Sequence, residues 1–488
     1  MLQVFPTYLM AGCGMVGAGL LLDYVQEWPA FVNVSEIIIV VPPLLGLKGN
    51  LEMTLAARLS TAANLGHLDD GKVALNTILG NLILVQCQGI VVGFLASLCG
   101  LAMGWLPKGG GNYEQALLLC ASSIVTASLA SFALAMVMVV VITFARRFRC
   151  NPDNIATPIA ASLGDVVTLG LLAWISDILY FDYNAGGYKA QVIIGGYFLV
   201  LPVFMALAYN NEHVAEVLRV GWTPVLMAML IASGGGFVLE MAVEHFEGVT
   251  LFAPVMNGSG GDLVGIQASR MTTYLNKVTN SLLGTFPEDD SKICRDPCST
   301  LCGDIPPFRK CQGNNKIPHA MPARVLLCLL FPGHILFIFI IFTVKILSTP
   351  SFLFVFFYLI AATLQVRAEY EYLMYSCVSR WRYYFTSAMF SSTGCGPAVL
   401  TRTMLPSPTL LRCVTTPDTS CHSVIIILQI GDLIGTSLLA VAFIILENVG
   451  DTSLQNLEES HHHTLAHNVT VALNQTLSHF DSELDNLL

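Results

Sequence analysis

Hydrophobic residues along this chain gather in long stretches that short polar segments separate. Eleven stretches approach the roughly 20 residues that an α-helix needs to cross the hydrocarbon core of a membrane. The pattern therefore predicts an all-α polytopic membrane protein with about 11 transmembrane helices. The tenth stretch is the shortest, because Arg367 follows it directly. The predicted spans are residues 4–24, 36–62, 78–105, 115–144, 155–181, 190–208, 219–243, 250–275, 319–345, 349–366 and 424–446.

Glycine and polar residues interrupt two of these stretches, 36–62 and 250–275. The first of them reads "PPLLGLKGNLEMTLAARL" and places Gly46 and Gly49 directly before Asn50. Glycine destabilises the interior of a helix, so we expect both helices to break at their glycines. The freed backbone carbonyls would then face a cavity, where irregular backbone is tolerated inside a membrane protein.

The interrupted stretches belong to an internal repeat with a constant offset of 212 residues. The segment from Pro42 resembles "PVMNGSGGDLVGIQASRM", which starts at Pro254. Upstream, "LLDYVQEW" resembles "VLEMAVEHF", so that Asp23 pairs with Glu240. The constant offset pairs Gly46 with Gly258, Gly49 with Gly261, Asn50 with Asp262, Leu51 with Leu263 and Arg58 with Arg270.

The last span of each half repeats as well. "ASLGDVVTLGLLA" resembles "LQIGDLIGTSLLA", and Asp165 and Asp432 take equivalent places after Gly164 and Gly431. The chain is therefore predicted to contain two halves of five spans. One extra span near 190–208 lets both halves start on the same side, so the repeats are parallel and related by an axis along the membrane normal.

This repeat predicts how the chain is organised. The predicted parts are the first transmembrane repeat at 1–181, a linker helix and loop at 182–218, the second repeat at 219–446 and a polar acidic tail at 447–488. The second repeat includes a loop at 284–318 with Cys294, Cys298, Cys302 and Cys311, for which free thiols and a zinc site are both possible readings.

Composition supports a membrane protein and excludes other classes. The chain is 54% hydrophobic and 11% charged, with a mean hydropathy of +0.67, whereas soluble proteins carry roughly 25% charged residues. A net charge of −10 and the absence of a basic cluster interleaved with aromatic residues give no nucleic-acid signature. No nucleophile–base pair stands out, so we do not expect an enzyme.

The distribution of basic residues predicts the orientation. With the N-terminus in the cytosol, the outside segments hold only Lys108, Lys189 and Lys345 among all lysines and arginines. The C-terminal tail is then extracellular, and its sequons at Asn468 and Asn474 can be glycosylated. We expect no cleavable signal peptide, because the chain starts without a basic n-region. Asn33 begins a third sequon close to the bilayer.

Several polar residues lie inside the predicted spans, where an unpaired charge costs at least ~2.5 kcal/mol. Each could cap a half-helix or pair with a neighbouring arginine. Alternatively, the two halves gather them around one axis, and such oxygen ligands favour a hard cation such as Mg²⁺ or Ca²⁺. The candidate ligands are Asp165, Asp432, Asn50 and Asp262; the candidate pore-lining or hinge glycines are Gly46, Gly49, Gly258, Gly261, Gly164 and Gly431; the candidate outer residues are Glu52, Thr54, Gln267, Arg58 and Arg270.

The motifs "PPLLGLKGNLEMTLAARLSTAANLG", "NPDNIATPIAASLGDVVTLGLL", "GSGGDLVGIQASR" and "GDLIGTSLL" resemble solute carrier family 41, the eukaryotic MgtE-like magnesium transporters. The resemblance implies two MgtE-like halves in one chain, with Asp165 and Asp432 at the ion site of the pore. It also implies Mg²⁺ transport, with Na⁺ as a coupling ion for efflux, in the lipid of the plasma membrane. No cofactor is implied beyond the transported ion.

One segment, 367–415, departs from the family pattern and makes the geometry around Asp432 less certain than that around Asp165. Two other readings therefore stay open. One is a secondary carrier for a small organic solute, which would need an arginine or aromatic contact for that solute. The other is a non-conducting isoform, which would tolerate loss of both aspartates.

Overall fold

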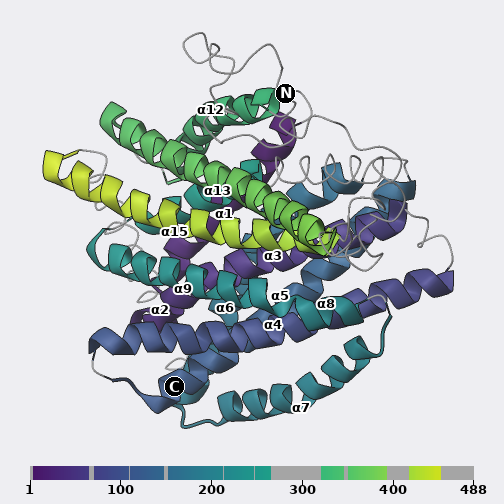
Figure 1. The fold of residues 1–488 in the computed structure, drawn as a ribbon. Helices are drawn as coiled ribbons and strands as arrows, with labels where there is room; N and C mark the ends of the chain where they lie inside the picture. Colours follow the sequence, from purple (N-terminus) through teal and green to yellow (C-terminus); the bar gives the residue numbers. More distant parts are fainter. Residues whose placement is uncertain are drawn as a thin grey trace.

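A computed structural model describes residues 4–64, 71–108, 110–147, 152–212, 214–246, 248–264, 320–345, 350–392 and 417–451, and those residues contain helices and no strand (Figure 1). The helices of the first part are α1 (Val4–Val25), α2 (Pro29–Asn33), α3 (Glu36–Asn64), α4 (Gly71–Lys108), α5 (Tyr113–Arg147) and α6 (Pro152–Asn184). Those that follow are α7 (Lys189–Tyr209), α8 (Ala215–Val220), α9 (Trp222–His245), a helix over 249–264, α12 (Ala320–Val344), α13 (Phe352–Ser392) and α15 (Pro417–Val449).

Eight of the described helices are long and apolar enough to cross a membrane, and the segments Glu36–Gly46 and Cys328–Val344 are shorter apolar helices. The prediction of an all-α polytopic membrane protein is thereby confirmed. The span predicted at 250–275 is helical over 249–264, and its remainder lies outside the described residues.

The expected helix breaks at the glycines are wrong. Helix α3 runs without interruption through Pro42, Gly46 and Gly49, and the helix over 249–264 runs through Gly258 and Gly261. Glycine weakens a helix by only about 1 kcal/mol per residue, which tertiary packing overrides. The glycines instead let neighbouring side chains approach the helix axis.

The tenth span is longer than the sequence predicts. Helix α13 continues through Arg367 to Ser392, and its membrane-spanning part is Phe352–Tyr372. The charge of Arg367 does not end the helix, because its Nε donates to Glu371 Oε1 one turn further on, at 3.0 Å.

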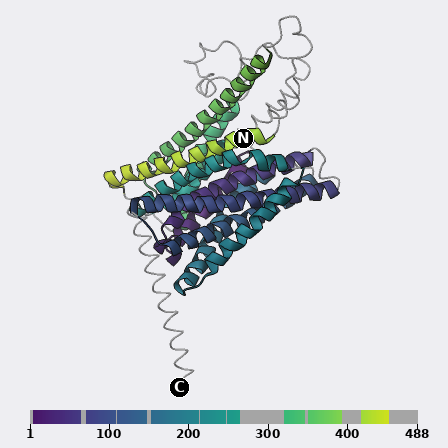
Figure 2. The ribbon, with the colours of Figure 1, turned by 60° about the horizontal axis from the view of Figure 1, so that its bottom comes forward.

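Helix pairs recur at corresponding places in the two parts of the chain (Figures 1 and 2). Helix α1 packs on α6 and α9 on α15; α4 packs on α5 and α12 on α13; α5 packs on α6 and α13 on α15. The first helix of each part also contacts the other part, since α1 touches α12 and α9 touches α3 and α4. This arrangement is what two interlocked repeats would produce, and the domain division at 181 and 219 stays a prediction.

Two glycines create the closest crossings between the two parts. A Cβ at Gly19 of α1 would collide with the backbone carbonyl of Leu251, and one at Gly236 of α9 would collide with that of Ile39. Ile39 and Leu251 are separated by the same 212 residues as the repeated prolines. Small residues at such crossings bring helix backbones together inside a membrane, where packing drives association.

Helix α7 lies at the edge of the bundle, along the lower side of Figure 1, against α4 and α5. Only 6% of its membrane-spanning window is buried in the protein. Its exposed side chains are apolar, among them Val192, Leu199 and Val203. We infer from this that the helix joining the two parts faces lipid.

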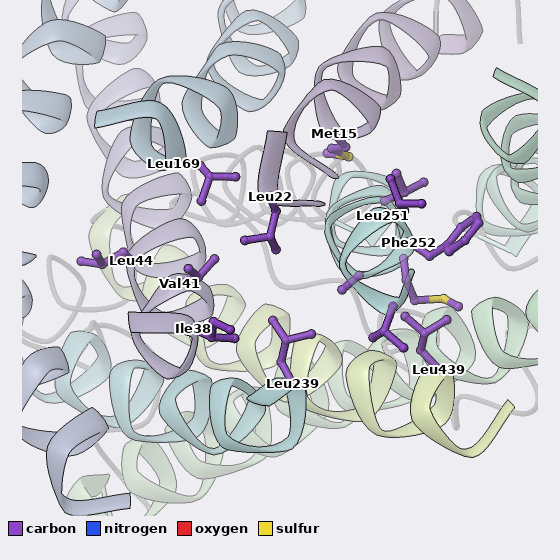
Figure 3. Close-up of a cluster of buried hydrophobic side chains, with 14 of the residues drawn as sticks. Met15, Leu22, Ile38, Val41, Leu44, Leu169, Leu239, Leu251, Phe252 and Leu439 are labelled. Atoms are coloured by element: carbon purple, nitrogen blue, oxygen red, sulfur yellow. The ribbon is translucent and has the colours of Figure 1, made fainter. Parts of the chain in front are cut away.

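Apolar side chains from helices of both parts of the chain fill the centre of the bundle (Figure 3). Leu22 of α1, Val41 of α3 and Leu239 of α9 are among them. A second group is aromatic, and Phe252 contacts the rings of Phe354 and Phe443 at centroid distances of 5.1 and 6.3 Å. These rings fix the helix over 249–264 against α13 and α15, which positions the candidate site.

Replacing Gly19 with leucine should destabilise the folded protein, because the new side chain would collide with the carbonyl of Leu251. Overpacking of this kind costs about 1–3 kcal/mol. The melting temperature of the detergent-purified variant should therefore fall, and Gly236→Leu should act in the same way at the equivalent crossing.

The matched control is Gly195→Leu in α7, where an added side chain would meet no atom within 4 Å. Its stability should stay within about 0.5 kcal/mol of the unmodified protein. Equal melting temperatures for Gly19→Leu and Gly195→Leu would show that the close crossing is wrong.

Candidate functional site

A cavity of about 120 Å³ lies at the centre of the bundle. Three helices of the first part, α1, α3 and α6, and three of the second part, α9, the 249–264 helix and α15, contribute its walls. Those are the helices that the sequence repeat pairs with one another. The lining residues are Met15, Leu22, Val41, Pro42, Leu45, Gly46, Asp165, Leu239, Ala253, Pro254, Asn257, Gly258, Gly261, Asp262, Leu428, Gln429 and Asp432.

Three carboxylates converge on this cavity. Asp165 comes from α6, Asp262 from the 249–264 helix and Asp432 from α15, and each is partly buried. The charge of Asp165 acts on both Asp262 and Asp432. Like charges in a low-dielectric site repel one another, so the cavity favours a positive ion.

Amide and hydroxyl groups hold Asp432 in place. Gln429 Nε2 donates a hydrogen bond to Asp432 Oδ2 at 3.1 Å. Thr436 Oγ1 donates to the backbone carbonyl of Asp432 at 2.9 Å and accepts a bond from Asn257 Nδ2 at 2.8 Å. The network therefore links α15 to the 249–264 helix across the wall of the cavity.

Three buried oxygens of the lining residues lack a donor. Asp262 Oδ2, Asn257 Oδ1 and Gln429 Oε1 accept no hydrogen bond from any residue that the structure describes. Leaving a buried acceptor unsatisfied costs about 1–3 kcal/mol. All three are acceptors, so a cation with its bound waters would satisfy them together.

The candidate glycines divide into two groups. Gly46, Gly258 and Gly261 line the cavity. A Cβ at Gly46 would come within 2.5 Å of the Gln429 side chain, and one at Gly258 within 2.7 Å of Met15. Gly431 is buried and faces α13 instead. The lining glycines thus make room for side chains at the cavity wall.

Of the other candidates that the structure describes, Gly164 and Arg58 do not line the cavity. Gly164 is buried in α6, where its carbonyl accepts a bond from Thr168 Oγ1 at 2.6 Å, and Arg58 lies partly buried in α3. Gly49 belongs to the unbroken α3. The side chains of Asn50, Glu52 and Thr54, and the whole of Gln267 and Arg270, lie outside the described residues, as do the four cysteines of the 284–318 loop, the tail sequons and residues 393–415.

Polar contacts join the two parts near the ends of α1 and α9, next to lining residues of the cavity. Asp23, next to the lining residue Leu22, accepts a bond from Thr250 Oγ1 at 3.0 Å and forms an ion pair with Lys345. Glu240, next to the lining residue Leu239, accepts a bond from Ser35 Oγ at 2.9 Å. We call these two contacts the paired clasps; each ties one part of the chain to the other.

The donor set determines which ion could bind. Among the residues that the structure describes, no group of three or more His, Cys, Asp and Glu side chains is placed to hold a metal ion directly. The three aspartates reach the cavity from three different helices, and the cavity has room for several waters. Oxygen donors and retained waters are typical of Mg²⁺.

Sequence reasoning missed Asn257 and Gln429. Both carry a positional signal, because helix neighbours three or four residues apart share a face. Gln429 lies three residues before Asp432, and Asn257 four residues before Gly261. A comparison of the two repeats does not reveal either residue, because the equivalent positions of the other half hold different residue types.

Comparison with known proteins gives one consistent family. The model of the MgtE family, described as a divalent cation transporter, matches residues 41–175. Solute carrier family 41 member 2 of Xenopus laevis is 42% identical over 458 residues, covering 92% of this chain and 72% of that protein. Member 2 of Homo sapiens is 40% identical over 92% of this chain and 71% of its own, and member 3 of Mus musculus is 37% identical over 90% and 81%. No solved structure matches.

Replacing Asp262 with asparagine should raise the melting temperature in a chelator, because one of three repelling charges is removed while the shape is kept. Adding Mg²⁺ should stabilise the unmodified protein by up to about 2.7 kcal/mol at a concentration a hundred times the dissociation constant. The variant should lose most of that stabilisation. Thermal unfolding of the purified proteins with and without Mg²⁺ measures both effects.

Asp182→Asn is the control for this comparison. Asp182 lies on α6 like Asp165, but it pairs with Lys189 outside the cavity, at 2.9 Å. Loss of the Asp182 charge should leave the Mg²⁺-dependent rise in melting temperature unchanged. If Mg²⁺ raises the melting temperature of Asp262→Asn as much as that of the unmodified protein, Asp262 is not part of the ion site.

Proposed function

The chain belongs to solute carrier family 41, and on that premise we propose that it transports Mg²⁺ across a membrane through the central cavity. The family consists of divalent cation transporters, which are carriers and not enzymes. The observation that carries the proposal is the convergence of Asp165, Asp262 and Asp432 on one cavity between the two parts of the chain.

The donor set favours Mg²⁺ over Ca²⁺. Calcium takes six to eight oxygen ligands directly, whereas Mg²⁺ sheds water reluctantly and is held by one or two carboxylates plus waters. Carboxylates from different helices, with carboxamides from Asn257 and Gln429 between them, suit the second case. We expect Asp165 and Asp432 to be the main carboxylates, with Asp262 assisting and Asn50 completing the set from α3.

The path itself follows the axis between the halves. In the predicted orientation, the paired clasps close the outer end, because α1 and α9 run from the cytosol outward. The cavity would then exchange ions with the cytosol in this state. Opening to the outside would require the clasps to separate. A plasma-membrane location, an extracellular C-terminal tail and coupling to Na⁺ remain expectations from the sequence and its family resemblance.

Transport of a small organic solute is the second candidate, and the cavity argues against it. Pockets for organic ligands usually have volumes of about 300–1,000 Å³, whereas this cavity measures about 120 Å³. Its polar lining is acidic, which also disfavours an anionic solute. Among the residues that the structure describes, no arginine or aromatic side chain lines it.

The test is Mg²⁺ flux in Mg²⁺-depleted cells that express the chain, compared with Asp165→Asn and Asp432→Asn. Each variant should lose roughly 10–100-fold in transport, since each removes a charge from the ion site. Surface labelling must show equal amounts of protein at the membrane.

Asp182→Asn should transport normally, because Asp182 lies outside the cavity. If the unmodified chain reaches the membrane but carries no Mg²⁺, it is a non-conducting isoform. If it transports and both aspartate variants transport equally well, the ion takes another route.

A further inference from the structure

A second cluster of buried oxygens lies beside the cavity, where α13 meets α15 and the 249–264 helix. Glu369 and Gln365 lie one turn apart on α13, and both have an exposed fraction of 0%. Gln365 Nε2 donates to Glu369 Oε1 at 3.0 Å. Neither residue lines the cavity, but Asn257, the third member of the cluster, does, so the cluster adjoins the candidate Mg²⁺ site and shares that residue with it.

Glycines make the space that Glu369 occupies. A Cβ at Gly260 would lie 3.2 Å from Glu369 Oε1 and 3.0 Å from Gln365 Nε2. A Cβ at Gly431 of α15 would collide with the Glu369 carboxylate. Both helices therefore present bare backbone to this carboxylate, and a larger residue at either position would displace it.

Two carboxamide oxygens lie against α15 one turn beyond Gly431. Gln365 Oε1 and Asn257 Oδ1 both lie against Gly435 of α15. Asn257 directs its nitrogen toward Thr436, which leaves its oxygen on the side of Gln365. The pocket thus contains one carboxylate and two amide oxygens contributed by two helices.

Each of these three side chains has one oxygen without a donor in the part of the chain that the structure describes. Glu369 Oε2, Gln365 Oε1 and Asn257 Oδ1 accept no hydrogen bond there. No basic side chain of the described residues forms an ion pair with Glu369, and the charge of Asp432 lies close enough to act on it. Burying an uncompensated carboxylate costs several kcal/mol, so the site calls for a positive charge.

We propose that Glu369, Gln365 and Asn257 form a second binding site, which takes a dehydrated monovalent cation. One carboxylate is neutralised by one positive charge, and oxygen donors suit a hard ion. The residues are fully or largely buried, which disfavours Mg²⁺ because that ion keeps several waters. Helix α5, which occupies the corresponding place in the first part, has Glu114 in its first turn as its one acidic residue, so the site has no counterpart there.

As a part of transport, this site rests on the proposed function, since a cation at Glu369 would act on the Mg²⁺ site through the charge of Asp432. Binding itself can be tested separately. The full-length protein in detergent and chelator is titrated with sodium, potassium or lithium chloride against choline chloride at constant ionic strength. At least one alkali cation should raise the melting temperature by about 3–5 °C.

Two variants separate the two sites. Glu369→Gln should lose the response to the alkali cation and keep its stabilisation by Mg²⁺, which also shows that it is folded. Asp262→Asn should do the reverse. Gln365→Leu should weaken the alkali response as well, and Glu371→Gln, an exposed carboxylate two residues along α13, is the matched control that should keep both.

Three results would overturn the proposal. One is an alkali response of unchanged size in Glu369→Gln. Another is no response of the unmodified protein to any alkali cation. The third is stabilisation by acidification alone that Glu369→Gln abolishes, which would mean that the carboxylate holds a proton. If an alkali cation stabilises the unmodified protein but Mg²⁺ does not, the result contradicts the proposed function and still supports this second site.

Discussion

Negative charge held inside an apolar bundle is the constraint on which the rest of this structure depends. The charge of Asp165 acts on both Asp262 and Asp432 across the cavity, and a buried charge without compensation costs several kcal/mol. The surrounding packing must carry that cost. Ring contacts of Phe252 with α13 and α15 hold the helices that present two of the aspartates. Packing therefore holds the helices of the site in place, whereas the negative charges of its aspartates stay uncompensated until a cation binds.

Contacts between the two parts of the chain explain why the cavity lies between them. Gly19 and Gly236 bring each leading helix against the opposite part of the chain. The paired clasps of Asp23 and Glu240 then lie directly beyond the apolar residues Leu22 and Leu239. In the proposed transport cycle, the two parts would move relative to each other at these glycine crossings. Movement at the clasps would expose the carboxylates without rebuilding either half.

Hydropathy was sufficient to predict most of the spans, because the membrane demands long apolar helices. The repeat brought Asp165, Asp262 and Asp432 to notice, and the structure places them around one cavity. Local propensity failed at Gly46, since packing decides whether a weak helix residue stays helical. Glu369 could not be recognised, because its surroundings come from glycines that are more than 60 and 100 residues away in sequence. The sequence shows an ordinary charged turn after an apolar run.

Glu369 also breaks the symmetry that the repeat imposes elsewhere. The cavity receives three helices from each part, so the main carboxylates Asp165 and Asp432 are related by the repeat. A charge at Glu369 acts on Asp432, and α5 offers no carboxylate in the corresponding region to act on Asp165. Occupancy of the second site by a cation would therefore change the two sides of the Mg²⁺ site unequally. A transporter with two equivalent halves needs such a difference if a second ion is to bias one half against the other.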